Sequence, residues 1–146
     1  MKPLHHALSR EVESAPMRRQ TILVVDDVPA FCRVAALFLG RHCGYTVHTA
    51  GSVQEAISAA REMRRVDLLL ADGDMPGLSG IELAEWFRAG SPDTAVVFVS
   101  ENPRSQVFRR WRHLVEKPFV HLEVLENTIE QALDDRAARK STPFAA

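Results

Sequence analysis

Three aspartates and one lysine close short apolar runs in this sequence. They are Asp26, Asp27, Asp72 and Lys117. Carboxylates that gather at one place bind a hard divalent cation through oxygen, and a lysine supplies a compact positive charge for an anion. The residue types therefore predict a site for Mg²⁺ and a phosphoryl group, provided that the fold brings the four side chains together.

The apolar runs themselves predict buried strands of a parallel sheet, with helices between them. The strands are expected over about 21–25, 45–49, 67–72, 94–100 and 114–117. The helices are expected from near 29 to near 40 or 44, from 53 to about 63, over 81–89, weakly over 104–113, and over 122–136. Ligands bind beyond the carboxyl ends of the strands in such a sheet, so the aspartates and the lysine are expected on one rim.

Length and composition favour one globular domain in a chain of 146 residues, of which 46% are hydrophobic and 25% charged. We expect the domain over 20–136, with flexible tails over 1–19 and 137–146. The net charge of −1 gives no general attraction to nucleic acid or to a membrane. No apolar stretch is long enough to span a bilayer. Cys32 and Cys43 lack metal-type spacing and are expected to be reduced thiols in a cytoplasmic protein.

Four motifs, in this order, make the chain resemble the receiver domain of two-component response regulators. They are Val24-Val25-Asp26-Asp27, Asp72-x-x-Met75-Pro76-Gly77 with Gly80, Ser100 after an apolar strand, and Lys117-Pro118-Phe119. The resemblance implies a flavodoxin-like, doubly wound α/β fold. Its five-stranded parallel sheet would have the order 2-1-3-4-5, with helices on both faces.

The resemblance also implies a role for each residue on the rim. Asp72 would be the phosphoacceptor, and Mg²⁺ would be held by Asp27, Asp72 and the backbone carbonyl of Asp74. Asp26 would act through a water molecule or as a further ligand. The phosphoryl group would then be bound by two further side chains, the ammonium of Lys117 and the hydroxyl of Ser100.

Such a domain is a signalling module rather than an enzyme. The implied donor is a histidine kinase or a histidine phosphotransfer protein, and the implied output is a downstream protein partner. A homodimer through the face of the last strand and its flanking helices stays open, and so does excision from a longer hybrid kinase.

Three positions near the acceptor depart from the family pattern and are expected to set the lifetime of the phosphoryl group. Glu101 can obstruct the pocket or place a negative charge near the incoming phosphate. Asp74 can bind a water on Mg²⁺ or repel the phosphoryl group through its side chain. Asn102 can orient a hydrolytic water.

The segment between Ser100 and Lys117 also departs from the family pattern. It is shorter than usual, which predicts a short or irregular fourth helix, and Leu114 stands where the family's switch usually has an aromatic residue. It carries a basic and aromatic cluster, Arg109, Arg110 and Trp111. We interpret this cluster as a partner surface, whereas nucleic-acid binding through phosphate contacts and stacking is the less favoured interpretation.

Two alternatives are weighed against a phosphorylated receiver. Glu101 and the missing aromatic residue favour a degenerate receiver that binds its partners without being phosphorylated. The Asp72-Gly73-Asp74 sequence superficially resembles the nucleophile motif of haloacid dehalogenase phosphatases. In those enzymes, however, the motif lies near the start and further acidic residues lie downstream, whereas Asp26 and Asp27 lie upstream here.

Overall fold

Five strands form one parallel sheet in the order β2-β1-β3-β4-β5, as the resemblance implies. The computed structural model describes residues 20–77, 79–117 and 121–140. The strands are β1 (Thr21–Val25), β2 (Thr46–Ala50), β3 (Leu68–Asp72), β4 (Ala95–Ser100) and β5 (Leu114–Glu116). Each lies within one residue of the expected range. A strand buried on both faces, such as β3, has an almost continuous apolar sequence, whereas β2 is mostly exposed along its length.

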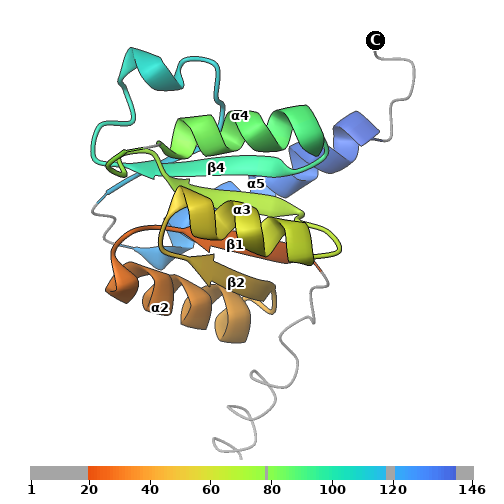
Figure 1. The fold of residues 1–146 in the computed structure, drawn as a ribbon. Helices are drawn as coiled ribbons and strands as arrows, with labels where there is room; N and C mark the ends of the chain where they lie inside the picture. The colour runs from red at the N-terminus through yellow and green to blue at the C-terminus, as the bar shows by residue number, and fades with distance from the viewer. Residues whose placement is uncertain (1–19, 78, 118–120, 141–146) are drawn as a thin grey trace, which may run out of the picture.

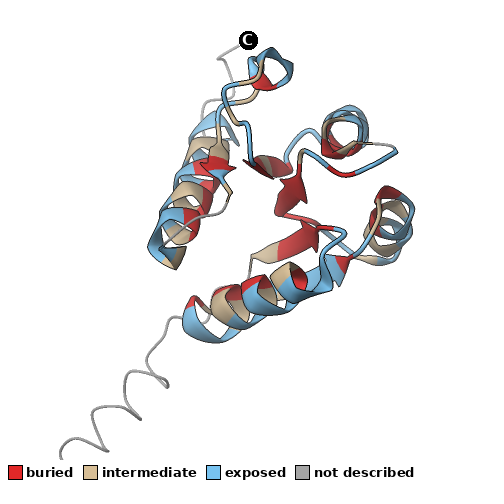
Figure 2. Cartoon of the chain, turned by 90° about the vertical axis from the view of Figure 1, so that its left-hand side faces the viewer, coloured by how far each residue is buried: buried red, intermediate tan, exposed pale blue. Residues whose placement is uncertain are grey.

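Helices connect the strands and lie on both faces of the sheet (Figure 1). They are α2 (Pro29–Leu37) with the short π-helix η1 (Phe38–His42), α3 (Val53–Glu62), α4 (Gly80–Gly90), the 3₁₀ turn η2 (Gln106–Phe108) and α5 (Leu122–Lys140). α2 and α5 pack against one face, and α3 and α4 against the other. Figure 2 shows the buried strands between these two helical layers.

The centre of the sheet is completely buried, because every residue of β3 is covered by helices on both sides. Its three leucines, Leu68, Leu69 and Leu70, have no exposed surface. Burying each leucine side chain stabilises the fold by roughly 1.5–3 kcal/mol. The rim residues at the carboxyl end of β3 therefore stand on a rigid support.

The last helix is longer than the sequence predicts. α5 continues to Lys140, four residues beyond the expected end at Arg136, so the predicted C-terminal tail begins inside this helix. Arg139 and Lys140 lie in its last turn, where positive charge interacts favourably with the helix dipole.

Three parts of the predictions fall outside the described residues. They are the predicted tail over 1–19, the residues beyond 140 and the Pro118-Phe119 part of the last motif.

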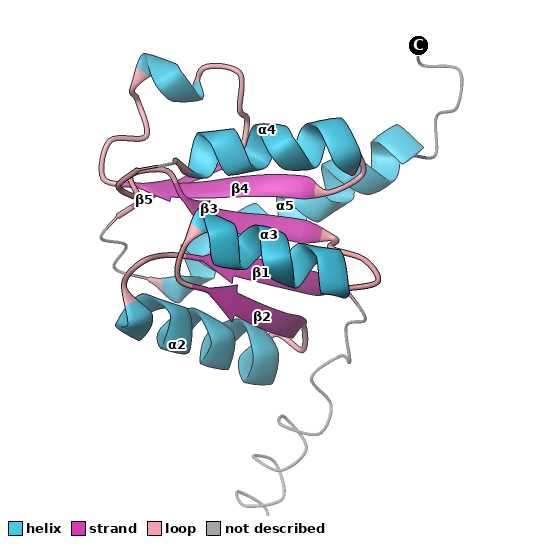
Figure 3. Ribbon diagram, viewed as in Figure 1, coloured by secondary structure: helices cyan, strands magenta, loops and turns pink. Residues whose placement is uncertain are grey.

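The connection between β4 and β5 contains a single short turn instead of a full helix, as its length predicts. Figure 3 shows this segment as a loop interrupted only by η2, in contrast with the other connections. Ser105 starts η2 by accepting a hydrogen bond from the amide of Val107, and Phe108 ends it as a buried residue. The helicity expected over 104–113 is therefore confined to three residues.

The strands bring their carboxyl ends to one side of the molecule, where the arrowheads of Figure 3 point. β1 and β3 are neighbours, with Val25 paired to Ala71, so Asp26 and Asp72 are at adjacent strand ends.

Among the described residues, no helix is both long and apolar enough to cross a bilayer.

Candidate functional site

The three aspartates predicted to bind a cation meet at the carboxyl ends of β1 and β3. One carboxylate oxygen of each of Asp26, Asp27 and Asp72 lies within 4.8 Å of the others. Asp26 and Asp72 are buried, whereas Asp27 is exposed. The structure thus brings together the side chains predicted from the sequence, and it leaves the cluster accessible from the Asp27 side.

Asp26 connects the cluster to Lys117. One oxygen of Asp26 accepts a hydrogen bond from the amide of Val28 at 2.8 Å, and the other accepts one from Lys117 Nζ at 2.6 Å. Lys117 also lies 3.6 Å from Asp72 Oδ2. Burial by itself would lower the pKa of Lys117, but the hydrogen bond and the charge of Asp26 raise it above its ordinary value. Lys117 therefore stays positively charged beside Asp72.

Asp27 differs from Asp26 because no described residue donates a hydrogen bond to it or forms an ion pair with it. Its carboxylate can turn toward a ligand without breaking a contact, whereas both oxygens of Asp26 are already engaged. The assignment of Asp27 as a direct ligand, with Asp26 acting through water or as a further ligand, stays a prediction.

Asp72 is held in a position where its negative charge is poorly compensated. Its Oδ1 accepts a hydrogen bond from the amide of Asp74 at 2.8 Å. Burial raises the pKa of Asp72, and the nearby carboxylates of Asp26 and Asp74 act in the same direction; the Asp74 amide and Lys117 oppose them but do not outweigh them. A divalent cation among these oxygens would supply the missing positive charge.

The donor set fits such a cation. Carboxylate oxygens are the ligands that Mg²⁺ prefers, and Mg²⁺ keeps several waters, so few protein ligands are enough. Gly80 helps to shape the site, because a Cβ atom at this position would overlap the carbonyl oxygen of Asp72. Only glycine lets the first turn of α4 approach the end of β3 this closely.

Ser100 lies on the same rim, buried at the end of β4, but its hydroxyl points to a carboxylate that the resemblance did not assign to it. The hydroxyl donates to Asp74 Oδ1 at 3.2 Å, and the amide of Glu101 donates to Asp74 Oδ2 at 2.9 Å. The amide of Asn102 donates to the Ser100 hydroxyl at 2.9 Å. The side chains of Glu101 and Asn102 are exposed, and their predicted effects on phosphoryl lifetime stay predictions.

Phe108 is a residue that sequence reasoning missed. It is buried, and its ring lies so close to Gly73 that a Cβ atom on Gly73 would be 2.5 Å from Phe108 Cζ. Its ring also packs against Phe98 at 5.3 Å between centroids. Leu114, the expected substitute for the switch aromatic, is only half-buried. The signal in the sequence was a bulky apolar residue, Phe108, in a mainly polar connection whose other large apolar residues are Val107 and Trp111.

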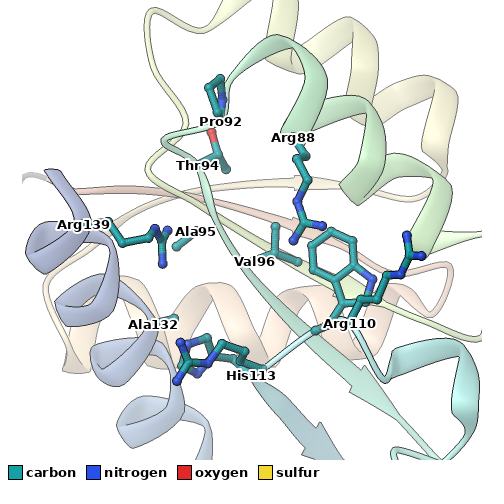
Figure 4. Close-up of a pocket in the computed structure, with 11 residues that line it drawn as sticks. Arg88, Pro92, Thr94, Ala95, Val96, Arg110, His113, Ala132 and Arg139 are labelled. Atoms are coloured by element: carbon teal, nitrogen blue, oxygen red, sulfur yellow. The ribbon is translucent and has the colours of Figure 1, made fainter. Parts of the chain in front are cut away.

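The predicted partner cluster lines a cleft of about 310 Å³ beside the amino end of β4 (Figure 4). Arg110 and Trp111 belong to this cleft, whereas Arg109 is exposed nearby. The guanidinium of Arg88 from α4 lies 3.9 Å from the centroid of the Trp111 ring, and that ring packs edge-on against Phe98. The cleft's other basic residues are Arg112, His113 and Arg139, and no carboxylate is among its described lining residues.

Comparison with known families gives one match that spans most of the chain. Residues 22–133 match the family described as the response regulator receiver domain. The matched range begins at the second residue of β1 and ends in α5, so it covers the sheet apart from Thr21 and includes every residue of the acidic cluster.

Several curated bacterial regulators share part of this sequence. The chain is 37% identical over 90 residues to the transcriptional activator protein ExaE of Pseudomonas putida, covering 61% of this chain and 42% of ExaE. It is 34% identical over 80 residues to the probable transcriptional regulatory protein TcrX of Mycobacterium tuberculosis, covering 55% of this chain and 33% of TcrX. The match therefore spans less than half the length of each relative.

Solved structures of two bacterial or archaeal proteins are similar over nearly their whole length. The response regulator TrrA of Thermotoga maritima, in complex with Mg²⁺-BeF, has a TM-score of 0.67 and 26% identity, and the match covers 77% of this chain and 98% of TrrA. A CheY-like receiver domain protein of Methanospirillum hungatei has a TM-score of 0.71 and 26% identity, and the match covers 84% of this chain and 99% of that protein.

Proposed function

This chain belongs to the response regulator receiver domain family, and from that premise we propose that Asp72 accepts a phosphoryl group from a phosphohistidine donor. One observation carries the proposal: Asp26, Asp27 and Asp72 converge within 4.8 Å while Lys117 lies 3.6 Å from Asp72. Family membership and the upstream position of the acidic pair also argue against the phosphatase alternative.

We propose that Mg²⁺ is held by Asp27, Asp72 and the backbone carbonyl of Asp74, with Asp26 acting through water or as a further ligand. The uncompensated charge of Asp72 and the unengaged carboxylate of Asp27 support this assignment. When bound, the ion offsets the negative charge of the carboxylates and of the incoming phosphoryl oxygens. TrrA, whose structure was solved with Mg²⁺-BeF, lends support from a similar chain.

In the proposed transfer, one carboxylate oxygen of Asp72 attacks phosphorus. An aspartyl phosphate bond forms, and the P–N bond of the phosphohistidine breaks. The electron pair of that P–N bond stays on the imidazole nitrogen of the donor. Uptake of a proton from water then restores the neutral ring. Lys117 stabilises the charge of the phosphoryl oxygens, because phosphoryl transfer depends mainly on alignment and electrostatic stabilisation.

The proposed partners are a histidine kinase or a histidine phosphotransfer protein as donor and a further protein as recipient of the signal. The basic cleft around Arg88, Arg110 and Arg112 suits a protein surface that carries carboxylates. The domain would take part in stoichiometric transfer in the cytoplasm rather than turn over a substrate.

The test is to incubate the full chain with acetyl phosphate, with and without Mg²⁺, and to read intact mass. We expect one phosphoryl group per chain in the presence of Mg²⁺ and none in Asp72→Asn. Asp93→Asn is the matched control, because Asp93 is an exposed aspartate away from the rim. Absence of any adduct in the wild type would favour the degenerate receiver instead.

A further inference from the structure

The carboxylate of Asp74 is bound by two donors at the carboxyl end of β4. They are the Ser100 hydroxyl, at 3.2 Å from Oδ1, and the Glu101 amide, at 2.9 Å from Oδ2. Each oxygen of the carboxylate therefore has a donor of its own. Together the hydroxyl and the amide form a small site for an anion, and a side chain of the protein occupies it.

This anion site is next to the acceptor. Asp72 pairs with Val99 in the β3–β4 register, so Ser100 is one residue beyond the acceptor's partner. The Gly73 amide donates to the Val99 carbonyl at 2.9 Å and fixes the two strand ends together. The Asp74 amide, in turn, donates to Asp72 Oδ1. A phosphoryl group on Asp72 would therefore reach the donors that now hold Asp74.

We propose that the Asp74 carboxylate is an internal competitor for the phosphoryl group, so that Asp74 is a positioning residue that slows phosphoryl acceptance. Two negative groups cannot share one hydroxyl and one amide, and each charge-assisted bond must be given up before the phosphoryl oxygens are bound. Asp74 is exposed, so its carboxylate can move out to water when it is displaced. This inference rests on the proposed function of Asp72.

The same contacts give the loop after β4 two alternative arrangements. With Asp72 unmodified, Ser100 and Glu101 are tied to the loop after β3 through the Asp74 side chain. With Asp72 phosphorylated, they are tied to the phosphoryl group, and Asp74 is released to solvent. The role of Glu101 in this exchange belongs to its backbone amide, since its side chain is exposed.

The test compares adduct formation from acetyl phosphate at saturating Mg²⁺ in wild type, Asp74→Asn and Asp74→Ala. Neither change removes the Asp74 backbone carbonyl. We expect Asp74→Ala to accept the phosphoryl group about tenfold faster than the wild type, and Asp74→Asn to be intermediate because its amide oxygen is a weaker, neutral acceptor. Asp93→Asn controls for the loss of one negative charge.

An unchanged rate of adduct formation in Asp74→Ala would overturn the proposal. So would an acceleration confined to Glu101→Ala, which would place the obstruction in the Glu101 side chain.

A second measurement needs no phosphoryl donor. The amide proton and nitrogen chemical shifts of Glu101 should change in Asp74→Ala as the hydrogen bond is lost, whereas unchanged shifts would contradict the contact itself. If no variant forms an adduct while these shifts do change, the proposed function fails although the contact exists.

Discussion

At the scale of single residues, the site concentrates more negative charge than its own lysine can balance. Asp26 uses both oxygens to fix Val28 and Lys117, which leaves Asp72 with only a 3.6 Å contact to the ammonium. This arrangement costs stability, because burial penalises the ionised form of Asp72. Under the proposed function this charge is needed, because a cation ligand and a nucleophile must both be ionised.

Asp72→Asn is therefore expected to make the protein more stable at neutral pH, by about 1 kcal/mol. The folded state raises the pKa of Asp72 above its ordinary value of 3.8, so it binds this proton more readily than the unfolded state does. Stability from this group accordingly falls as pH rises from the ordinary pKa through the raised one. In urea unfolding without metal, Asp72→Asn should have a higher free energy of unfolding than the wild type at pH values above the raised pKa of Asp72. This difference should disappear at pH values below the ordinary pKa.

Addition of Mg²⁺ supplies the matching check on this prediction. The ion should raise the free energy of unfolding of the wild type more than that of Asp72→Asn, since a ligand stabilises the state that binds it. If Asp72→Asn has a lower free energy of unfolding than the wild type at every pH without metal, the ionised Asp72 carboxylate does not destabilise the fold, and this view is contradicted.

At the scale of elements, the β4–β5 connection has no packed helix and instead packs two aromatic residues, Phe108 and Trp111, against Phe98. Phe108 lies against Gly73, directly after Asp72, and Phe98 links Phe108 to Trp111 in the basic cleft. These contacts join the acidic rim to the proposed partner surface. The length of the segment predicted that a helix would be missing, but only the packing shows which side chain fills the space.

Gly73→Ala is expected to destabilise the protein by about 1–3 kcal/mol, because the new methyl group must displace the Phe108 ring. The Phe108→Ala change should relieve this overlap, so the double variant should lose less stability than the sum of the two single variants. Chemical unfolding of the three variants measures this coupling.

Gly90→Ala is the matched control, since a Cβ atom at Gly90 meets nothing within 4 Å. It should leave the free energy of unfolding unchanged or slightly increase it. Strict additivity between Gly73→Ala and Phe108→Ala would show that the contact does not connect the two positions.

At the scale of the whole molecule, the geometry of a parallel sheet is the part of the site that the sequence predicts. Asp26, Asp72 and Lys117 were expected together because the carboxyl ends of parallel strands share one rim, and the structure places them there. The Asp74–Ser100 contact was not predictable, since it depends on side-chain directions in two loops. The end of α5 was misplaced because its last turns are exposed and carry no apolar period.

The amino ends of the strands carry a third buried carboxylate, that of Asp67, which ties β1 to α5. Asp67 accepts a hydrogen bond from the Thr21 amide at 2.8 Å, and its other oxygen lies 2.7 Å from Arg136 and 2.8 Å from Arg65. Burial by itself would raise the pKa of Asp67, but the hydrogen bonds from Arg136 and Thr21 and the two arginine charges lower it overall.

Asp67 should therefore make stability sensitive to acid. A carboxyl whose folded pKa is lowered stabilises the fold above its ordinary pKa of 3.8, and this stability is lost as pH falls through the lowered value. Asp67→Asn should cost about 3 kcal/mol near neutral pH, because it leaves the partly buried guanidinium of Arg136 without its charge partner. Urea unfolding across this pH range should show a weaker acid dependence in the variant; parallel curves would refute the assignment.

The central claim, that Asp72 is the phosphoacceptor, is tested most directly by locating the modified residue. Borohydride reduces an aspartyl phosphate to homoserine, which peptide mass spectrometry can assign to one position. After treatment with acetyl phosphate and Mg²⁺, homoserine is predicted at position 72 and at none of positions 26, 27 and 74, and it should be lost without Mg²⁺. Homoserine at one of those other aspartates, or at none, would contradict the account.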